Sequence, residues 1–121
     1  MSISVLVADD SKLSRRSVIR SLPQDLEYDI TEATNGQEAI NALSESEFAL
    51  VLLDLTMPEV DGVQVLERIK AEKIECFVLV ISADIQQQMK QKVAQLGAID
   101  FINKPINKSA LSEVLHKFGI H

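Results

Sequence analysis

The residues of this chain that are best suited to chemistry each follow a short apolar run. They are the pair Asp9 and Asp10, then Asp54, Ser82 and Lys104. If the apolar runs are parallel strands of one sheet, their carboxyl ends share one edge, and these polar side chains meet in the crevice there. Three carboxylates at close quarters repel one another unless a cation neutralises them. The pattern therefore predicts a site for a divalent cation at one edge of a sheet.

The donor atoms favour magnesium over zinc at this site. Its ligands would be oxygens, because the sequence places no pair of histidines near it and Cys76 stands at the opposite end of its strand. Lys104 would add a cation facing the carboxylates, and Ser82 would supply a hydroxyl donor. A metal ion, an ammonium group and a hydroxyl around one carboxylate form a receptacle for a phosphoryl group, which Asp54 would receive.

Five apolar segments predict the strands that must position these residues. Four of them are nearly continuous, as in parallel strands that are buried on both faces. The remaining one alternates with polar residues, as an edge strand does. In chain order the predicted strands are residues 3–8, 26–33 (the alternating segment), 49–53, 77–81 and 99–102.

Helical periodicity occupies the intervals between these strands. Two apolar stripes have this period: Ile85, Met89, Val93 and Leu96, and then Leu111, Val114, Leu115 and Phe118. Asn35, three residues before Glu38, can cap a helix start, and Gly97 can end a helix. Five strands that alternate with five helices predict a doubly wound α/β sheet, because parallel neighbours need crossover helices on both faces.

The composition excludes several classes of protein. The 121 residues suit one domain, residues 1–121, with no separate output domain. The net charge of -6 opposes binding to nucleic acid or to an anionic membrane. Cys76 is the only cysteine, so an internal disulfide is excluded and a small buried residue in a reducing compartment is expected. Since the sequence has neither a basic leader nor an apolar run of about 20 residues, we expect a cytoplasmic protein without membrane association.

Four motifs in succession resemble those of bacterial response-regulator receiver domains. They are Asp9-Asp10, the segment 54–62, Ser82-Ala83 and the segment 97–105. The run Asp-Asp-Ser followed by paired arginines is also similar to chemotaxis-type regulators of the CheY kind. The resemblance implies a flavodoxin-like (βα)5 sandwich, with a five-stranded parallel sheet in the order 2-1-3-4-5.

The resemblance also assigns a phosphoacceptor and a metal site. It implies that Asp54 is phosphorylated by a phosphohistidine of a sensor histidine kinase or a histidine phosphotransfer protein. Magnesium would be held by Asp10, Asp54 and the backbone carbonyl of Thr56, with Asp9 acting through water. A domain of this kind is not an enzyme for other substrates, since it catalyses only its own phosphorylation and dephosphorylation.

Further residues match the parts of the family that sense the phosphoryl group. Ser82, with Ala83, and Lys104 would bind phosphoryl oxygens, and the Lys104–Pro105 bond would be cis. Phe101 matches an aromatic position whose ring turns inward when Ser82 is drawn to the phosphate. The fourth helix, fifth strand and fifth helix would then present a changed surface to a downstream protein, and we expect a monomer.

Other residues near the site are open to two interpretations. Thr56 and Asp84 lie two residues after Asp54 and Ser82, where side chains of this family face the site and affect the phosphoryl lifetime. The basic residues Lys12, Arg15, Arg16 and Arg20 of the first helix form either a solvated face or a contact with the kinase-side partner.

Alternative functions share parts of this pattern. A magnesium-dependent phosphatase of the haloacid dehalogenase type needs its second Asp two residues after the nucleophile and a cap domain, whereas Asp9 and Asp10 are adjacent. A flavin carrier needs a Ser/Thr/Gly-rich phosphate loop after the first strand. A receiver-like interaction module that works without phosphorylation, or a phosphate sink, remains the alternative, and the output partner is open between a flagellar switch, an enzyme and a phosphorelay.

Overall fold

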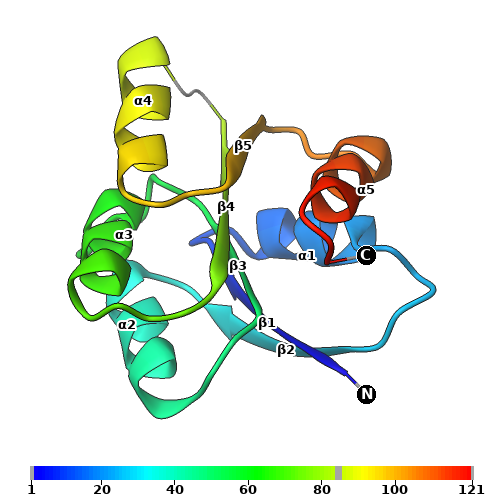
Figure 1. The fold of residues 1–121 in the computed structure, drawn as a ribbon, viewed down its shortest axis with the longest axis horizontal. Coiled ribbons are helices and arrows are strands. Elements are labelled where there is room, and N and C mark those ends of the chain that lie inside the picture. The colour runs from blue at the N-terminus through cyan, green and yellow to red at the C-terminus, as the bar shows by residue number, and fades with distance from the viewer. Residues whose placement is uncertain (1, 84–85, 121) are drawn as a thin grey trace.

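The computed structural model describes residues 2–83 and 86–120. Within these residues, five parallel strands form a single sheet in the order β2-β1-β3-β4-β5. A helix follows each strand (Figure 1). In chain order the elements are β1 (Ile3–Ala8), α1 (Lys12–Ser21), β2 (Tyr28–Ala33), α2 (Gly36–Glu45), β3 (Leu50–Leu53), α3 (Gly62–Ala71), β4 (Phe77–Ser82), α4 (Gln87–Gln95), β5 (Asp100–Asn103) and α5 (Lys108–Lys117). The predicted flavodoxin-like α/β fold is confirmed.

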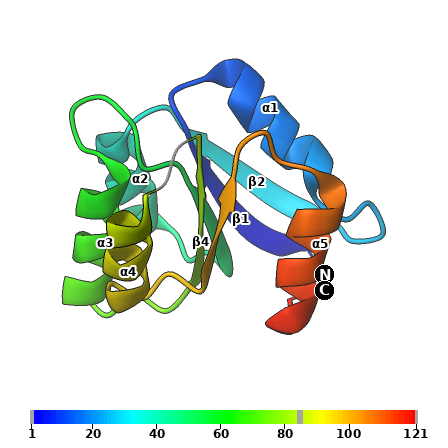
Figure 2. The same ribbon diagram turned by 90° about the horizontal axis from the view of Figure 1, so that it is seen from above.

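The helices cover both faces of the sheet. Helices α1 and α5 lie on one face, and α2, α3 and α4 lie on the other (Figures 1 and 2). Successive strand residues point to opposite faces, so β3 sends Leu50 and Leu52 into the α1/α5 core and Val51 and Leu53 into the other. All four are fully buried, which explains why the sequence of this strand is continuously apolar.

The predicted element bounds differ from the structure at the sheet's edges. Strand β5 is an edge strand, as the predicted order 2-1-3-4-5 requires, but it is not buried on both faces as its apolar run suggested: Ile102 is buried and Asn103 is exposed. Strand β2 is the other edge, as predicted, and begins at Tyr28 rather than at residue 26. Ile85, the first residue of a predicted helical stripe, lies outside the described residues, as do Asp84 and His121.

Local capping residues begin the helices that follow the strand ends. Ser11 caps α1 by accepting a hydrogen bond from the Ser14 backbone N–H, and Asn35 caps α2 in the same way, as its sequence predicted. Asp61 begins α3 with a reciprocal capping box. Directly after it, Gly62 lies so close to the main chain of Asp54 that a side chain there would overlap the Asp54 carbonyl oxygen.

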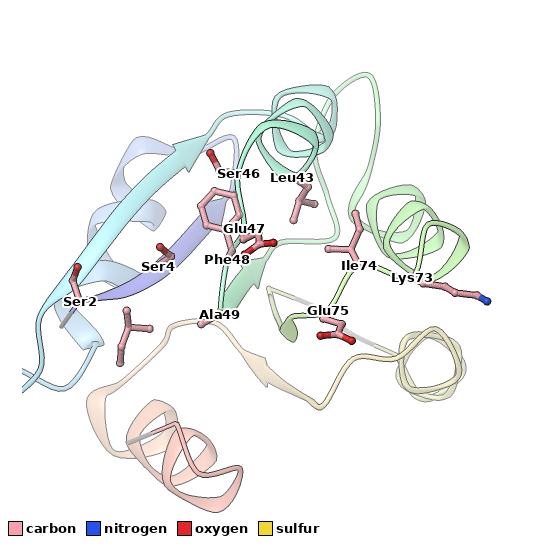
Figure 3. A pocket seen from close by; sticks show the side chains of 11 residues that line it. Ser2, Ser4, Leu43, Ser46, Glu47, Phe48, Ala49, Lys73, Ile74 and Glu75 are labelled. Carbon is pink, nitrogen blue, oxygen red and sulfur yellow. The ribbon is translucent and has the colours of Figure 1, made fainter.

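A cavity of about 790 Å³ lies near the amino ends of the strands, at the edge opposite the strand ends where the chemical residues gather. Segments 2–4, 46–49 and 73–75 contribute most of its lining, and Figure 3 shows their side chains around it. Cys76, at the same edge, is half-buried, and burial raises the pKa of its thiol.

None of the helices in the described ranges combines the length and the apolar character required to cross a membrane.

Candidate functional site

The carboxyl ends of the central strands bring the predicted residues together. Ala8 at the end of β1 pairs with Leu53 at the end of β3, so Asp9 and Asp54 come directly after neighbouring residues. The backbone N–H of Asp54 donates to the carbonyl of Ala8 at 2.9 Å. On the other side, the N–H of Lys104 donates to the Ser82 carbonyl at 2.8 Å. Backbone pairing therefore fixes the Cα positions from which these side chains extend.

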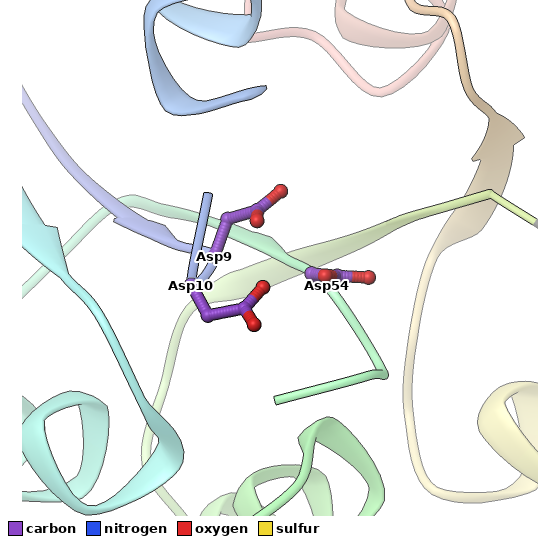
Figure 4. Close-up of side chains that lie close together, drawn as sticks. All are labelled: Asp9, Asp10 and Asp54. Atoms are coloured by element: carbon purple, nitrogen blue, oxygen red, sulfur yellow. The ribbon is translucent and has the colours of Figure 1, made fainter. Parts of the chain in front are cut away.

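The three aspartates form one acidic cluster. Asp9, Asp10 and Asp54 each offer a carboxylate oxygen, and these oxygens all lie within 4.8 Å of one another. Figure 4 shows the three carboxylates side by side. Asp9 and Asp54 are buried, whereas Asp10 is exposed. A cation at this point would be reached from solvent on the Asp10 side.

Lys104 lies between two of these carboxylates. Its Nζ is 2.7 Å from Oδ2 of Asp9 and 3.5 Å from Oδ2 of Asp54. Burial lowers the pKa of Lys104, but the hydrogen bond to Asp9 and the negative charges of Asp54 and Asp9 outweigh that effect, so the net shift is upward. Lys104 therefore stays charged at neutral pH.

Asp9 is already well satisfied by the protein. Its Oδ1 accepts from the backbone N–H of Ser11 at 2.9 Å, and its Oδ2 accepts from Ser14 Oγ at 2.6 Å and from Lys104. Among the described residues, no hydrogen-bond donor serves the Asp10 carboxylate. The oxygens left to bind a metal ion directly are therefore those of Asp10 and Asp54, which fits a site where Asp9 contributes through water.

Asp54 is a buried carboxylate whose negative charge is only partly compensated by its neighbours. Burial raises its pKa most, the negative charge of Asp9 raises it further, and the charge of Lys104 and the Thr56 N–H oppose these effects. The Thr56 N–H donates to Asp54 Oδ1 over a long 3.4 Å. A cation or an electrophile that neutralises this charge would relieve the cost of its burial. The donor set thus fits Mg²⁺, which prefers carboxylate, carbonyl and water oxygens.

The remaining predicted residues surround this cluster at different depths. Ser82 is 3% exposed at the end of β4, and Ala83 next to it is exposed. A cavity of about 270 Å³ lies beside Ser82 and Thr56, toward the start of α4. Phe101 is half-buried on β5, and the Lys104–Pro105 peptide bond is cis, the form that the resemblance implied. The structure thus brings Asp9, Asp10, Asp54, Ser82 and Lys104 to the same edge of the sheet, whereas Phe101 lies within β5 and packs toward α4.

One interpretation of the first helix was wrong. Arg15 was grouped with the solvated basic residues, but it is only 9% exposed. Its Nη1 donates to the carbonyl of Asp9 at 2.8 Å, and its Nε donates to Glu32 of β2 at 2.8 Å. The guanidinium therefore ties α1 to the ends of two strands. Lys12, Arg16 and Arg20 are exposed, as a solvated face requires.

Ser14 and Arg15 are the site residues that the sequence did not reveal. Ser14 lies three residues after the helix cap Ser11, which directs it back toward the end of β1. That spacing was a usable signal for Ser14. The burial of Arg15 depends on Glu32, seventeen residues further on, and no local pattern marks that pair.

Comparison with known proteins agrees with this architecture. The family model described as the response regulator receiver domain matches residues 5–116. The chemotaxis protein CheY of Listeria monocytogenes is 35% identical over 116 residues, which make up 95% of this chain and 97% of that protein. CheY of Thermotoga maritima is 34% identical over 118 residues, or 97% of this chain and 98% of that protein.

Solved structures give the same result. A chain in the crystal structure of the CheX-CheY-BeF3-Mg+2 complex from Borrelia burgdorferi superposes with a TM-score of 0.88 at 25% identity, over 98% of this chain and 90% of that chain. The BeF3-activated DrrB receiver domain superposes with a TM-score of 0.85 at 25% identity, over 100% of both chains.

The 2-1-3-4-5 sheet with an acidic cluster at its carboxyl edge, together with the family match, defines a signalling receiver domain. The chain belongs to the response-regulator receiver domain family. Within that family it is CheY-like over nearly its whole length.

Proposed function

We propose that Asp54 accepts a phosphoryl group from a phosphohistidine of a sensor histidine kinase or a histidine phosphotransfer protein. The observation that carries this proposal is the position of Asp54: a buried carboxylate at the end of the central strand β3, within 4.8 Å of the other carboxylates and 3.5 Å from Lys104. The aspartyl phosphate would then change the surface that α4, β5 and α5 present to a protein partner.

The transfer uses residues in separate roles. An oxygen of Asp54 attacks phosphorus, the P–N bond to the donor imidazole breaks, and the imidazole leaves with the electron pair of that bond. Asp10, Asp54 and the carbonyl of Thr56 would hold Mg²⁺, which, when bound, neutralises negative charge on the phosphoryl oxygens. Hydrolysis by water would later return Asp54 to its carboxylate form.

Lys104 and Ser82 would bind the oxygens of the phosphoryl group after transfer. Lys104 already reaches toward Asp54, so a small shift away from Asp9 is enough to bring its ammonium to a phosphoryl oxygen. Ser82 is buried beside the site and would move toward the phosphate through the adjoining cavity. The space that Ser82 leaves is what the ring of Phe101 would fill on turning inward.

Energy considerations require that several residues share the switch. Moving a two-state equilibrium from about 1:99 to 99:1 takes roughly 5.5 kcal/mol of differential interaction. One hydrogen bond from Ser82 to a charged group supplies only ~1.5–3 kcal/mol. Lys104 and the metal ion therefore have to contribute the remainder.

We propose a chemotaxis-type regulator that works as a monomer in the cytoplasm. The similarity to CheY proteins along nearly the whole chain supports the chemotaxis role. Among the described residues, the large exposed apolar side chains are Leu13 and Phe77, on separate elements, and they form no patch of the size that a stable dimer needs. A phosphohistidine donor and a free Cys76 both suit the reducing cytoplasm.

Labelled acetyl phosphate with Mg²⁺ tests the acceptor. Wild-type protein should take up label, and Asp54→Asn should take up none. Asp29→Asn, which removes an exposed carboxylate of β2, is the matched control and should be labelled like the wild type. Equal labelling of Asp54→Asn would rule out the assignment and would favour the phosphorylation-independent interaction module.

A further inference from the structure

Helix α4 is the helix held most loosely against the sheet. Of its described residues, Val93 alone is buried. Two lysines hold it in addition. Lys70 of α3 donates to the main-chain oxygen of Gln95 at 2.8 Å, at the carboxyl end of α4. In the middle of α4, Lys90 places its Nζ 4.5 Å from the centroid of the Phe101 ring.

The ring of Phe101 lies between two parts of the proposed output surface. On one side it packs against the core under α4, where Lys90 covers it. Phe101 also lines a cavity of about 350 Å³ with Val114 and Lys117 of α5. A change in the position of this ring would therefore alter its surroundings at both α4 and α5.

The elements α4, β5 and α5 have a net positive charge although the whole chain carries a net charge of -6. Helices α4 and α5 and strand β5 together carry four lysines, Lys90, Lys92, Lys108 and Lys117, against two acidic residues, Asp100 and Glu113. Lys90 is half-buried against the ring rather than fully presented to solvent. Charge complementarity points to an acidic partner segment.

We propose that Phe101 sequesters the ammonium group of Lys90 in this conformation, and that the ring releases it when it turns inward. The released ammonium then binds a carboxylate of an acidic partner segment. The inference rests on the proposed function, because phosphorylation of Asp54 is what moves the ring. Lys90 is thus a partner-binding residue whose exposed positive charge depends on the position of the Phe101 ring.

The size of the effect follows from the contact. A lysine over an aromatic ring at a partly exposed site is stabilised enough to favour the contact by about two- to fivefold. A partner carboxylate has to compete with the ring before the switch and binds without that competition afterwards. The affinity for an acidic segment should therefore rise by about two- to fivefold through Lys90.

Nuclear magnetic resonance of the side chains tests the release. In untreated protein the Hε resonances of Lys90 should be shifted upfield by the ring of Phe101, and Phe101→Leu should abolish the shift. Beryllofluoride with Mg²⁺ should remove it in wild-type protein while the Thr56 amide, which bonds to Asp54, reports loading. A Thr56 response with an unchanged Lys90 shift would overturn this inference alone. An unresponsive Thr56 would overturn the phosphoacceptor proposal and this inference with it.

Binding of an octaglutamate peptide tests the output. Wild-type protein should bind it about two- to fivefold more tightly with beryllofluoride than without. Lys90→Gln should bring this ratio close to one. Lys92→Gln is the matched control, since Lys92 is exposed on the same helix and has no ring or carboxylate partner in the described part of the chain. It should weaken binding in both states and keep the ratio. Loss of the ratio in both variants, or in neither, would refute the proposal.

Discussion

Asp54 carries its charge where a carboxylate is poorly solvated, and this cost is the basis of its proposed reactivity. Burial and the neighbouring Asp9 both raise its pKa, while Lys104 and the Thr56 N–H compensate only in part. The same carboxylate that destabilises the fold is the one that a phosphoryl group would neutralise most effectively. The proposed function and the unfavourable burial of a charge thus coincide at one residue.

Replacing Asp54 should stabilise the protein at neutral pH. Below the reference pKa of 3.8 both the folded and the unfolded state hold the proton. As the pH rises, the unfolded state ionises first because the folded pKa is raised, so the free energy of unfolding falls until the folded state ionises too. In metal-free buffer, Asp54→Asn should therefore have a higher free energy of unfolding than wild type at pH 7.

Urea unfolding between pH 3.5 and pH 7 measures this effect. The gain of Asp54→Asn over wild type should shrink as the pH falls toward the reference pKa. Asp29→Asn, on the exposed edge strand, should show no such trend. A stability difference for Asp54→Asn that is constant with pH would contradict the raised pKa.

Lys104 should be needed for the response rather than for the transfer. Lys104→Ala should still take label from acetyl phosphate, because Asp10, Asp54 and Mg²⁺ remain, but its Phe101 ring should stay in the unphosphorylated position. Labelling and ring resonances measured on the same sample decide this. Ring resonances that move as in wild type would show that Lys104 is dispensable for the switch.

At the scale of elements, Arg15 joins helix α1 to the ends of β1 and β2. Arg15→Met should cost about 1–3 kcal/mol, because the buried carbonyl of Asp9 and the carboxylate of Glu32 lose their donor. Arg16→Met, at the exposed neighbouring position, should stay within about 0.5 kcal/mol of wild type. Urea unfolding of the two variants gives the comparison, and equal losses would mean that the Arg15 contacts do not contribute.

The elements could be predicted from the sequence where local patterns determine them. The ends of β1, β3 and β4 follow from apolar runs, and each of the polar residues after these runs is at the site in the structure. The edge position of β5 followed from the strand order that the family resemblance implies, whereas its apolar run alone resembles that of a central strand. The burial of Arg15 could not be predicted from its local sequence, because its partner Glu32 lies on strand β2.

At the scale of the whole molecule, magnesium should stabilise the fold because its ligands come from separate strands. Asp10 follows β1 and Asp54 follows β3, so only the folded chain assembles the site. A ligand at about 100 times its dissociation constant adds about 2.7 kcal/mol to the free energy of unfolding. Wild-type protein should therefore melt at a higher temperature in saturating Mg²⁺.

Calorimetry in MgCl2, against NaCl of equal ionic strength, measures this stabilisation. Asp10→Asn should abolish most of it, since Asp10 offers the exposed carboxylate of the cluster. Asp29→Asn should keep it. A Mg²⁺ effect of equal size in Asp10→Asn would place the ion elsewhere on this acidic chain.

Strand β3 lies in the middle of the sheet, with two strands on each side, and this position affects how other proteins can approach the site. Asp54 follows β3, so the sheet extends from it through β1 and β2 on one side and through β4 and β5 on the other (Figure 1). The proposed phosphate donor and the proposed downstream partner would then contact different flanks of the sheet. Phosphoryl transfer and binding of the downstream partner would then not exclude each other sterically.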